Sequence, residues 1–304
     1  MVAILAGGTG GAKLARGMLD VVGPEELCVV ANTADDIEVY GVHVSPDPDL
    51  VALWLADLID ERGYGVRGDT WEVMTALADA GHETWFRLGD RDLALCLVRT
   101  ELLRAGRRLT EAHAAVLEAL GTRARVLPMS DEPVRTHVRA GGRTWPFQEF
   151  MIVAGAGAGP PVEEVELRGI ARAAPSTEVL EAIARAEAIV IGPSNPVISI
   201  GPILNVPGMR HAIANAAAPT VAVSPFVGGR AVKGPTEAFC AQAGIAATAQ
   251  GVAEAYAGVI DGVVADEPVS GVAALEIDTL MDTPEARGRV AGATLEFARS
   301  LSGG

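Results

Sequence analysis

The chain is poor in cysteine, in aromatic residues and in basic residues. Its 304 residues include three cysteines, Cys28, Cys96 and Cys240, in apolar contexts without metal-binding or redox spacing. They are expected to be buried thiols in a reducing compartment, which excludes a disulfide framework. Lysine and arginine number 24 against 39 aspartate and glutamate residues, a formal net charge of −15. That balance disfavours nucleic acid and anionic membranes, both of which attract basic surfaces.

Long apolar runs are absent as well. No stretch reaches the roughly twenty apolar residues of a membrane-spanning helix, and the N-terminus lacks the basic prelude and cleavage site of a signal peptide. We therefore expect a cytoplasmic protein with neither a membrane nor a nucleic-acid partner.

Glycine is plentiful at the start of the chain, where the first seventeen residues predict a strand, a tight turn and a helix. An apolar run at residues 2–6 is followed by glycine or threonine from Gly7 to Gly11, and a helical pattern starts near Ala12. Backbone N–H groups of such a turn, with the positive end of the helix, favour an anionic group, usually phosphate. A tight turn without a ligand is the alternative.

Two common phosphate-binding motifs do not fit this turn. A P-loop has serine or threonine after its lysine, but Leu14 follows Lys13, so the hydroxyl that binds magnesium is missing. The dinucleotide fingerprint needs a third glycine where Lys13 stands, and an acidic ribose ligand where the next strand ends in Asn32. The turn therefore predicts nucleotide-phosphate binding of another kind.

Strand and helix patterns alternate along most of the chain, which predicts an α/β fold: a Rossmann-like, doubly wound, mainly parallel sheet. Almost pure helical periodicity between residues 49 and 121 predicts a helical insertion or cap, which leaves residues 1–48 and 122–304 as the nucleotide-binding core. From residue 265 onward we expect a linker and then a helix from about Thr283. The expected strands are 2–5, 27–31, 188–191 and 220–224, with weaker candidates at 126–129 and 162–167.

Two acidic clusters lie in the first fifty residues. Asn32, Thr33 and Asp36 directly follow a core strand, at the sheet edge where open α/β folds bind ligands, and their oxygen atoms suit Mg²⁺ bridged to a phosphate. A capped turn is the structural alternative. In the second cluster, Asp47 as N-cap with Pro48 at the first helical position is a sufficient structural explanation, but it leaves the acidic Asp49 to be explained by the helix dipole or by catalysis.

Two further clusters carry basic residues or small polar ones. Arg87 to Asp92 form a mixed-charge turn, which is either a solvated ion-pair network or an arginine clamp for phosphate. Loops after two later strands contain Ser194 and Asn195, and then Gly228, Gly229, Arg230 and Lys233, which resemble a second anion-binding nest.

Taken in order, these stretches resemble the CofD/FbiA family, the 2-phospho-L-lactate transferases of deazaflavin coenzyme F-420 biosynthesis. The order and spacing of the motifs, from the first strand to about residue 235, make the match specific. The matching stretches are 5–17, 32–36, 45–49, 88–92, 127–131 with Val134 and Thr136, 147–149, 191–196 and 233–235.

The resemblance implies transfer of a phospho-organic-acid group from a guanosine diphosphate conjugate to the ribityl hydroxyl of the deazaflavin FO, with release of GMP. It also implies a requirement for Mg²⁺ and a homodimer. The donor is a lactyl, glyceryl or enolpyruvyl conjugate, and the composition favours the enolpyruvyl form of bacterial members. A more distant relative, the YvcK-type nucleotide-sugar-binding regulator, shares the glycine turn and is the non-catalytic alternative.

Phosphoryl transfer needs positioning and charge neutralisation more than a covalent nucleophile, and the family roles are assigned on that basis. Tryptophans 54, 71, 85 and 145 are expected either to stack on the deazaflavin or to pack in the core. We expect Asp49→Asn to abolish transfer and leave the fold intact. The predicted catalytic residues are Asp36, Asp49 and Arg91; the predicted metal ligands are Asn32, Asp36, Asp47 and Asp49; the predicted substrate-binding residues are Gly8, Thr9, Gly10, Gly11, Lys13, Thr33, Arg87, Asp90, Ser194, Asn195, Gly228, Gly229 and Lys233.

Overall fold

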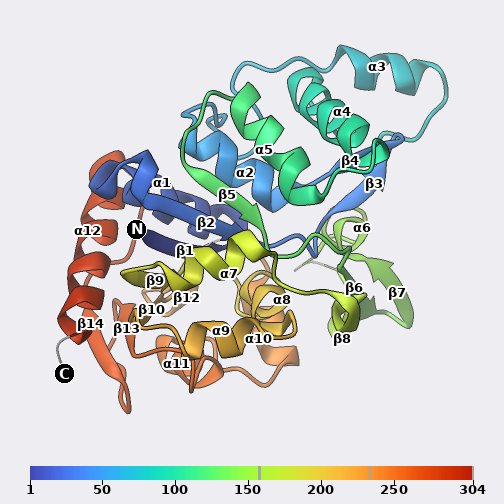
Figure 1. The fold of residues 1–304 in the computed structure, drawn as a ribbon. Coiled ribbons are helices and arrows are strands. Elements are labelled where there is room, and N and C mark those ends of the chain that lie inside the picture. The colour runs from blue at the N-terminus through green and yellow to red at the C-terminus, as the bar shows by residue number, and fades with distance from the viewer. Residues whose placement is uncertain (157–158, 233, 303–304) are drawn as a thin grey trace.

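A computed structural model describes residues 1–156, 159–232 and 234–302 of the chain (Figure 1). Seven parallel strands form its central sheet, in the order β14-β13-β10-β9-β1-β2-β5. The bounds of the seven strands in chain order are Val2–Ala6 for β1, Leu27–Ala31 for β2, Arg125–Pro128 for β5, Ala188–Ile191 for β9, Thr220–Val223 for β10, Gly262–Ala265 for β13 and Ala273–Glu276 for β14.

The sheet is doubly wound, as the sequence predicts. From β1 in the middle of the sheet, β2 and β5 follow in chain order toward one edge. From its neighbour β9, the strands β10, β13 and β14 follow in chain order toward the other edge. The winding direction therefore reverses between β1 and β9, and ligands of open α/β sheets bind at such a point, beyond the carboxyl ends of the strands. Every residue of β1 and β9 is buried, because helices cover both faces of the sheet.

Each face of the sheet has its own hydrophobic core. Alternate residues of β1, such as Ile4, pack with helices α1 (Gly8–Val22), α2 (Pro46–Leu55) and α12 (Pro284–Leu301). The intervening residues, such as Leu5, pack with helices on the opposite face. Those helices are α7 (Thr177–Ala184), α8 (Ile200–Asn205), α9 (Met209–Ala214), α10 (Thr236–Gln242) and α11 (Ala249–Ala255).

Helices dominate residues 49–121, in accordance with their periodicity. The helices α3 (Glu72–Asp79), α4 (Asp90–Arg104) and α5 (Leu109–Ala119) follow α2 and lie together at one end of the molecule (Figure 1). Helix α2 itself shares the hydrophobic core of the sheet with α1. The packing of α2 therefore places this helix with the sheet. The predicted division of the chain into a nucleotide-binding core and a helical insertion that begins at residue 49 stays a prediction.

Several strands fall outside the predicted set. A three-stranded antiparallel sheet has the order β7-β6-β8, with β6 at Arg135–Ala140, β7 at Arg143–Pro146 and β8 at Val162–Arg168. The predicted strand at 162–167 is thus real but lies outside the parallel sheet, and it is mostly exposed. Strand β14 lies inside the predicted linker, because its pairing with β13 outweighs a weak local pattern.

The remaining elements are short. Strands β3 (Ile37–Val39) and β4 (Val42–Val44) form one hairpin, β11 (Phe226–Val227) and β12 (Arg230–Ala231) form another, and α6 covers Phe147–Ile152. The C-terminal helix begins where predicted, because the Thr283 side chain accepts a hydrogen bond from the Ala286 N–H. Within the described ranges, no helix combines the length and apolar character needed to cross a bilayer.

Candidate active site

Three loops meet at the point where the winding direction of the sheet reverses. They follow β1, β2 and β9, and they carry the glycine turn, Asn32 and the 192–196 loop. The Gly7 N–H points at Ser194 Oγ, 3.4 Å away, and the Asn32 side-chain amide donates to the Ile198 carbonyl at 3.4 Å. The structure therefore brings together the glycine turn, the cluster that contains Asn32 and the loop that contains Ser194.

The glycine turn is glycine-rich partly because its neighbours are so close. A Cβ atom on Gly10 would lie 2.0 Å from the Pro193 carbonyl oxygen, and one on Gly11 would lie 2.8 Å from Ser194 Oγ. Gly8 differs, because its φ of +67° requires glycine while open space surrounds it. Close packing thus explains why residues 10 and 11 are glycine. The backbone of Gly8, by contrast, faces the candidate site.

We expect Gly10→Ala to destabilise the protein by roughly 1–3 kcal/mol, because the 192–196 loop must move away from the added methyl group. Gly288→Ala is the matched control: it lies within α12, a Cβ there meets nothing within 4 Å, and alanine gains about 0.5–1 kcal/mol in a helix. Urea unfolding of both variants measures the difference. Equal midpoints would contradict the packing role of Gly10.

Asp47 links the glycine turn to the acidic clusters. Helix α2 begins at Pro46 with Ser45 as its N-cap, so the interpretation of Asp47 as the N-cap of this helix is wrong. Its carboxylate instead accepts hydrogen bonds from the Gly8 N–H at 2.8 Å and from the Asn32 amide at 2.9 Å. Burial raises the pKa of Asp47 to about 6, against these two bonds, which favour the charged form. Asp47 is therefore a buried acid at the start of α1.

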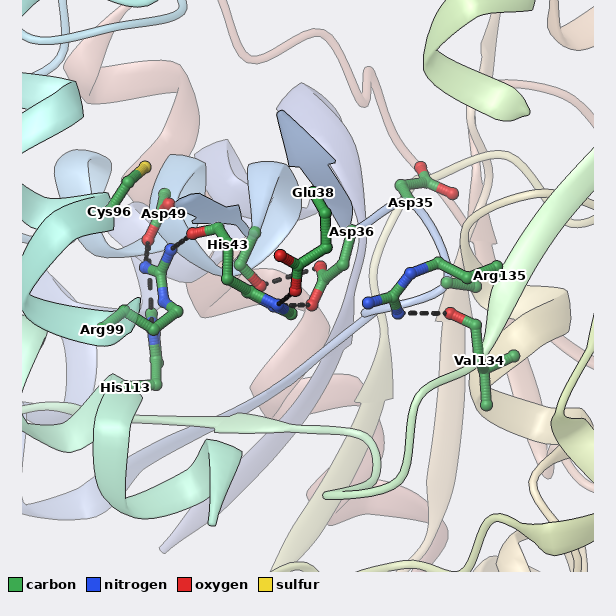
Figure 2. A network of polar contacts seen from close by, with 12 residues as sticks. Asp35, Asp36, Glu38, His43, Asp49, Cys96, Arg99, His113, Val134 and Arg135 are labelled. Atoms are coloured by element: carbon green, nitrogen blue, oxygen red, sulfur yellow. Dashed lines mark hydrogen bonds and ion pairs between the residues drawn. The ribbon is translucent and has the colours of Figure 1, made fainter. Parts of the chain in front are cut away.

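Two more buried carboxylates lie beside it. Asp36 accepts hydrogen bonds from Ser45 Oγ at 2.8 Å and interacts with His43 Nε2 at 2.9 Å (Figure 2). Burial raises the pKa of Asp35 well above its ordinary value, and the charges of Asp47 and Asp36 raise it further. Negative charge is thus concentrated here, and a cation would relieve the repulsion.

This concentration bears on the predicted metal site. Across residues 1–156, 159–232 and 234–302, no three His, Cys, Asp or Glu side chains are grouped closely enough to hold a metal ion by themselves. Mg²⁺ is commonly bound by one or two carboxylates together with substrate phosphates, and hard oxygen ligands suit it. The Asp47 carboxylate, next to mutually repelling carboxylates, fits that mode. Asn32 fits it less well, because its amide nitrogen faces Asp47 and its oxygen accepts a hydrogen bond from the Ala34 N–H at 2.9 Å.

Asp49 is held by an ion pair that the sequence did not reveal. Its carboxylate is bonded to the guanidinium of Arg99, which also donates to the His43 carbonyl at 3.3 Å (Figure 2). Arg99 is fully buried, and His113 Nδ1 lies 3.9 Å from Asp49. Burial and the Arg99 charge lower the pKa of His113 well below its ordinary value, so this ring is neutral. The positive charge of Arg99 therefore balances the negative charge of the Asp49 carboxylate in the site.

The sequence gives little sign that Arg99 is buried, because Leu97 and Val98, which precede it in α4, are exposed. A buried arginine requires an acidic partner, but a sequence does not identify which aspartate supplies it.

A cavity of about 210 Å³ opens beside Asp47 and Asp49. Its apolar and aromatic wall comes from α2, the 64–71 loop and the 86–88 segment, and Trp71 is the one tryptophan that lines it. Arg87 lies at its edge with its guanidinium 5.1 Å from the centre of the Trp71 ring. The lining residues are Val44, Pro46, Asp47, Asp49, Leu50, Leu53, Tyr64, Gly65, Trp71, Phe86, Arg87, Leu88, Asp92 and Cys96.

Several predicted site residues have other contacts. Asp90 binds the N–H groups of Glu72 and Val73 and so caps α3, and Arg91 is exposed, with its guanidinium directed at the Arg67 carbonyl. Neither residue lines the cavity. Of the two arginines predicted to clamp a phosphate, Arg87 lines the cavity and Arg91 does not.

The predicted second anion nest has a structural explanation. Gly228 and Gly229 form the two-residue loop of the β11–β12 hairpin, with φ values of +58° and +72°. A turn with two positive φ values favours glycine at both positions. The Gly228 N–H donates to the Asp266 carboxylate, so this N–H already has an anionic partner. Lys233 lies outside the described residues.

Two predicted polar residues retain atoms without partners. Among the described side chains, Thr33 Oγ1 and Asn195 Nδ2 are buried without a hydrogen-bond partner. An unpaired buried polar group is costly and is often completed by a ligand. Thr9 and Lys13 follow Gly8 within the first two turns of α1.

Fold and site together define a doubly wound α/β protein whose candidate active site lies at the point where the winding of the sheet reverses. The sequence profile described as 2-phospho-L-lactate transferase CofD matches residues 2–278. A phosphoenolpyruvate transferase of Kitasatospora aureofaciens is 40% identical over 320 aligned positions, which cover 100% of this chain and 99% of that protein. A 2-phospho-L-lactate transferase of Methanosarcina mazei is 40% identical over 265 positions, covering 87% and 86%.

Two crystal structures of one Bacillus halodurans protein, described as a member of the UPF0052 family, are 21% and 20% identical to the chain. Their TM-scores are 0.61 and 0.65, and each comparison covers 97% of this chain and 98% of theirs. At this identity the likeness supports the fold alone. The profile and the curated relatives show that the chain belongs to the CofD family of transferases.

Proposed function

We propose that the chain transfers a phospho-organic-acid group from a guanosine diphosphate conjugate to the ribityl hydroxyl of the deazaflavin FO and releases GMP, in coenzyme F-420 biosynthesis. The observation that carries the proposal is the position of Asp47. This residue binds the first N–H of α1 and also lines the aromatic cavity. A phosphate donor at the helix and an acceptor in the cavity would therefore meet at one carboxylate.

The donor side of the proposal rests on the loops after β1, β2 and β9. The first turn of α1 has no capping side chain of its own, and its N–H groups and the helix dipole favour phosphate. Thr33 Oγ1 and Asn195 Nδ2 are buried there without partners, and each supplies a hydrogen-bond donor. In this proposal they hold the diphosphate, with Ser194 at the base of the turn.

The acceptor side rests on the chemistry of the cavity. Trp71, Phe86 and Tyr64 offer aromatic surface for a flat ring. Three carboxylates, those of Asp47, Asp49 and Asp92, accept hydrogen bonds and repel anions. A neutral, aromatic polyol such as FO suits this lining better than a nucleotide does.

Mg²⁺ enters the proposal as a bound cofactor, with Asp47 as its protein ligand, because the Asn32 oxygen already accepts a hydrogen bond from the Ala34 N–H. It would neutralise charge on the donor phosphates during the transfer. Asp36 would position Ser45 and His43 through its hydrogen bonds, and Arg99 would keep Asp49 in place. The homodimer implied by the family resemblance stays a prediction.

The test is incubation of the protein with FO, Mg²⁺ and each of three guanylyl donors, lactyl, glyceryl and enolpyruvyl, followed by mass analysis of the deazaflavin. We expect the mass of FO to increase by the phospho-organic-acid group with at least one donor. The donor that gives product identifies the substrate, which the relatives leave open because they carry both names. No product with any donor, together with tight binding of a nucleotide sugar, would favour the YvcK-type regulator.

A further inference from the structure

A carboxylate outside the predicted catalytic set faces the acceptor cavity. Asp92 is the third residue of α4, and its side chain lines the cavity together with Asp47 and Asp49. Its backbone N–H binds Asp69, which fixes the start of the helix and therefore the direction of the side chain. Gly65, whose φ of +71° favours glycine, lies beside it: a Cβ atom there would be in van der Waals contact with the Asp92 Oδ2 atom at 3.4 Å.

Asp92 differs from the other two cavity carboxylates in its bonding. Asp49 is paired with Arg99, and Asp47 already accepts bonds from Gly8 and Asn32. No Lys, Arg or His side chain of the described chain lies within ion-pair distance of Asp92, although Arg62 acts on it from further away. Among the described residues, its carboxylate has a hydrogen bond with the Val66 backbone but no ion-pair partner.

We propose that Asp92 is the base that takes the proton from the acceptor hydroxyl in the transfer reaction. In this step the O–H proton passes to a carboxylate oxygen of Asp92, and the hydroxyl oxygen forms a bond to the phosphorus that carries the organic acid. The bond between that phosphorus and the bridging oxygen breaks, and GMP leaves with the electron pair. The inference rests on the proposed function and adds the residue that handles the proton.

The electrostatic surroundings of Asp92 suit that role. Burial, together with the negative charges of Asp49 and Asp69, raises its pKa to about 7, and the positive charge of Arg62 and a hydrogen bond from the Val66 backbone oppose this shift. Tyr64, Arg87, Cys96 and Asp47 are the other titratable groups that line the same cavity. A base with a pKa near the working pH accepts and releases protons efficiently.

Asp92→Asn tests the proposal, because asparagine keeps the shape and cannot take the proton. We expect kcat to fall by about 10²- to 10³-fold, while KM for the guanylyl donor changes little. The wild-type rate should fall as the pH drops below about 7, because the base becomes protonated, and this acid limb should be absent in the variant. Circular dichroism and thermal melting check that the variant is folded.

Arg62→Gln is the second variant, since Arg62 lies outside the cavity lining and its charge lowers the pKa of Asp92. Its acid limb should move to higher pH, with the maximal rate retained. If wild type makes product and Asp92→Asn keeps both its kcat and its acid limb, the assignment of Asp92 is overturned and the proposed function stands. Failure of wild type to make product from any donor overturns both.

Discussion

Asp47→Asn is expected to reduce transfer by on the order of 10³-fold. The variant keeps the size of the side chain and removes the charge that accepts bonds from Gly8 and Asn32. Because the carboxylate is a proposed Mg²⁺ ligand and touches both halves of the site, the loss should appear in kcat at saturating FO and donor. Product mass in the deazaflavin assay provides the measurement.

The Asp47 side chain also makes the stability of the folded protein depend on pH. Burial raises the pKa of Asp47 to about 6, above the value of about 3.9 in an unfolded chain, so the folded protein binds an extra proton between these values. Without metal, the Asp47 contribution to stability is therefore lost as the pH rises from about 4 to above 6. Asp47→Asn removes this titration, so its melting temperature in EDTA should not show the wild-type decline between pH 4 and pH 7.5. The asparagine NH₂ group cannot accept one of the bonds from Gly8 and Asn32, so the melting temperature should be lower than that of wild type at pH 4.

Added Mg²⁺ separates the two roles of this carboxylate. It should raise the melting temperature of wild type at pH 7.5 and leave that of Asp47→Asn unchanged, because binding to the folded state stabilises it. A variant that retains both full transfer and the Mg²⁺ shift would remove Asp47 from the site.

Arg99→Met is expected to destabilise the protein by about 3–5 kcal/mol, because it leaves Asp49 as an unpaired buried charge. The Arg99 side chain has 0% exposure and bonds to Asp49 and to the His43 carbonyl, so one substitution breaks both contacts. Urea unfolding measures the loss. For the same reason, the expectation that Asp49→Asn leaves the fold intact needs revision, since that change leaves Arg99 without its counter-ion.

The matched control is the double variant Arg99→Met with Asp49→Leu, which replaces the ion pair with apolar side chains. Its stability should return to within about 1–2 kcal/mol of wild type, since apolar replacement of a buried pair is often neutral or favourable. If the urea midpoint of Arg99→Met alone equals that of wild type, the ion pair between Arg99 and Asp49 does not contribute to the stability of the fold.

The sequence was sufficient for five strands of the parallel sheet, β1, β2, β5, β9 and β10, whereas β13 and β14 fell outside the predicted strands. Continuous apolar runs such as residues 2–6 and 188–191 became its buried central strands, because strands covered on both faces need no polar residues. The antiparallel sheet was harder to predict. Residues of β8 are exposed or half-buried, and β6, which forms a hairpin with β7, is completed by its pairing with β8 further along the chain.

The candidate site was predictable in part for a similar reason. Residues that directly follow parallel strands, such as Asn32 and Ser194, share one edge of the sheet, so strand order alone brings them together. The bond from Gly8 to Asp47 depends on how α2 packs against α1, which local patterns do not specify. Asp90 and Gly228 belong to motifs that suit ligands, but here their polar groups satisfy backbone or carboxylate partners.

The proposed transfer is tested most directly by a single-turnover experiment with excess protein, limiting guanylyl donor, FO and Mg²⁺, in which GMP and modified deazaflavin are quantified together. We expect the two products to appear at equal rates and in a one-to-one ratio, and omission of FO or of Mg²⁺ to suppress both. Release of GMP at an undiminished rate without FO, or formation of neither product by the wild-type protein with any of the three donors, would contradict the proposed transfer.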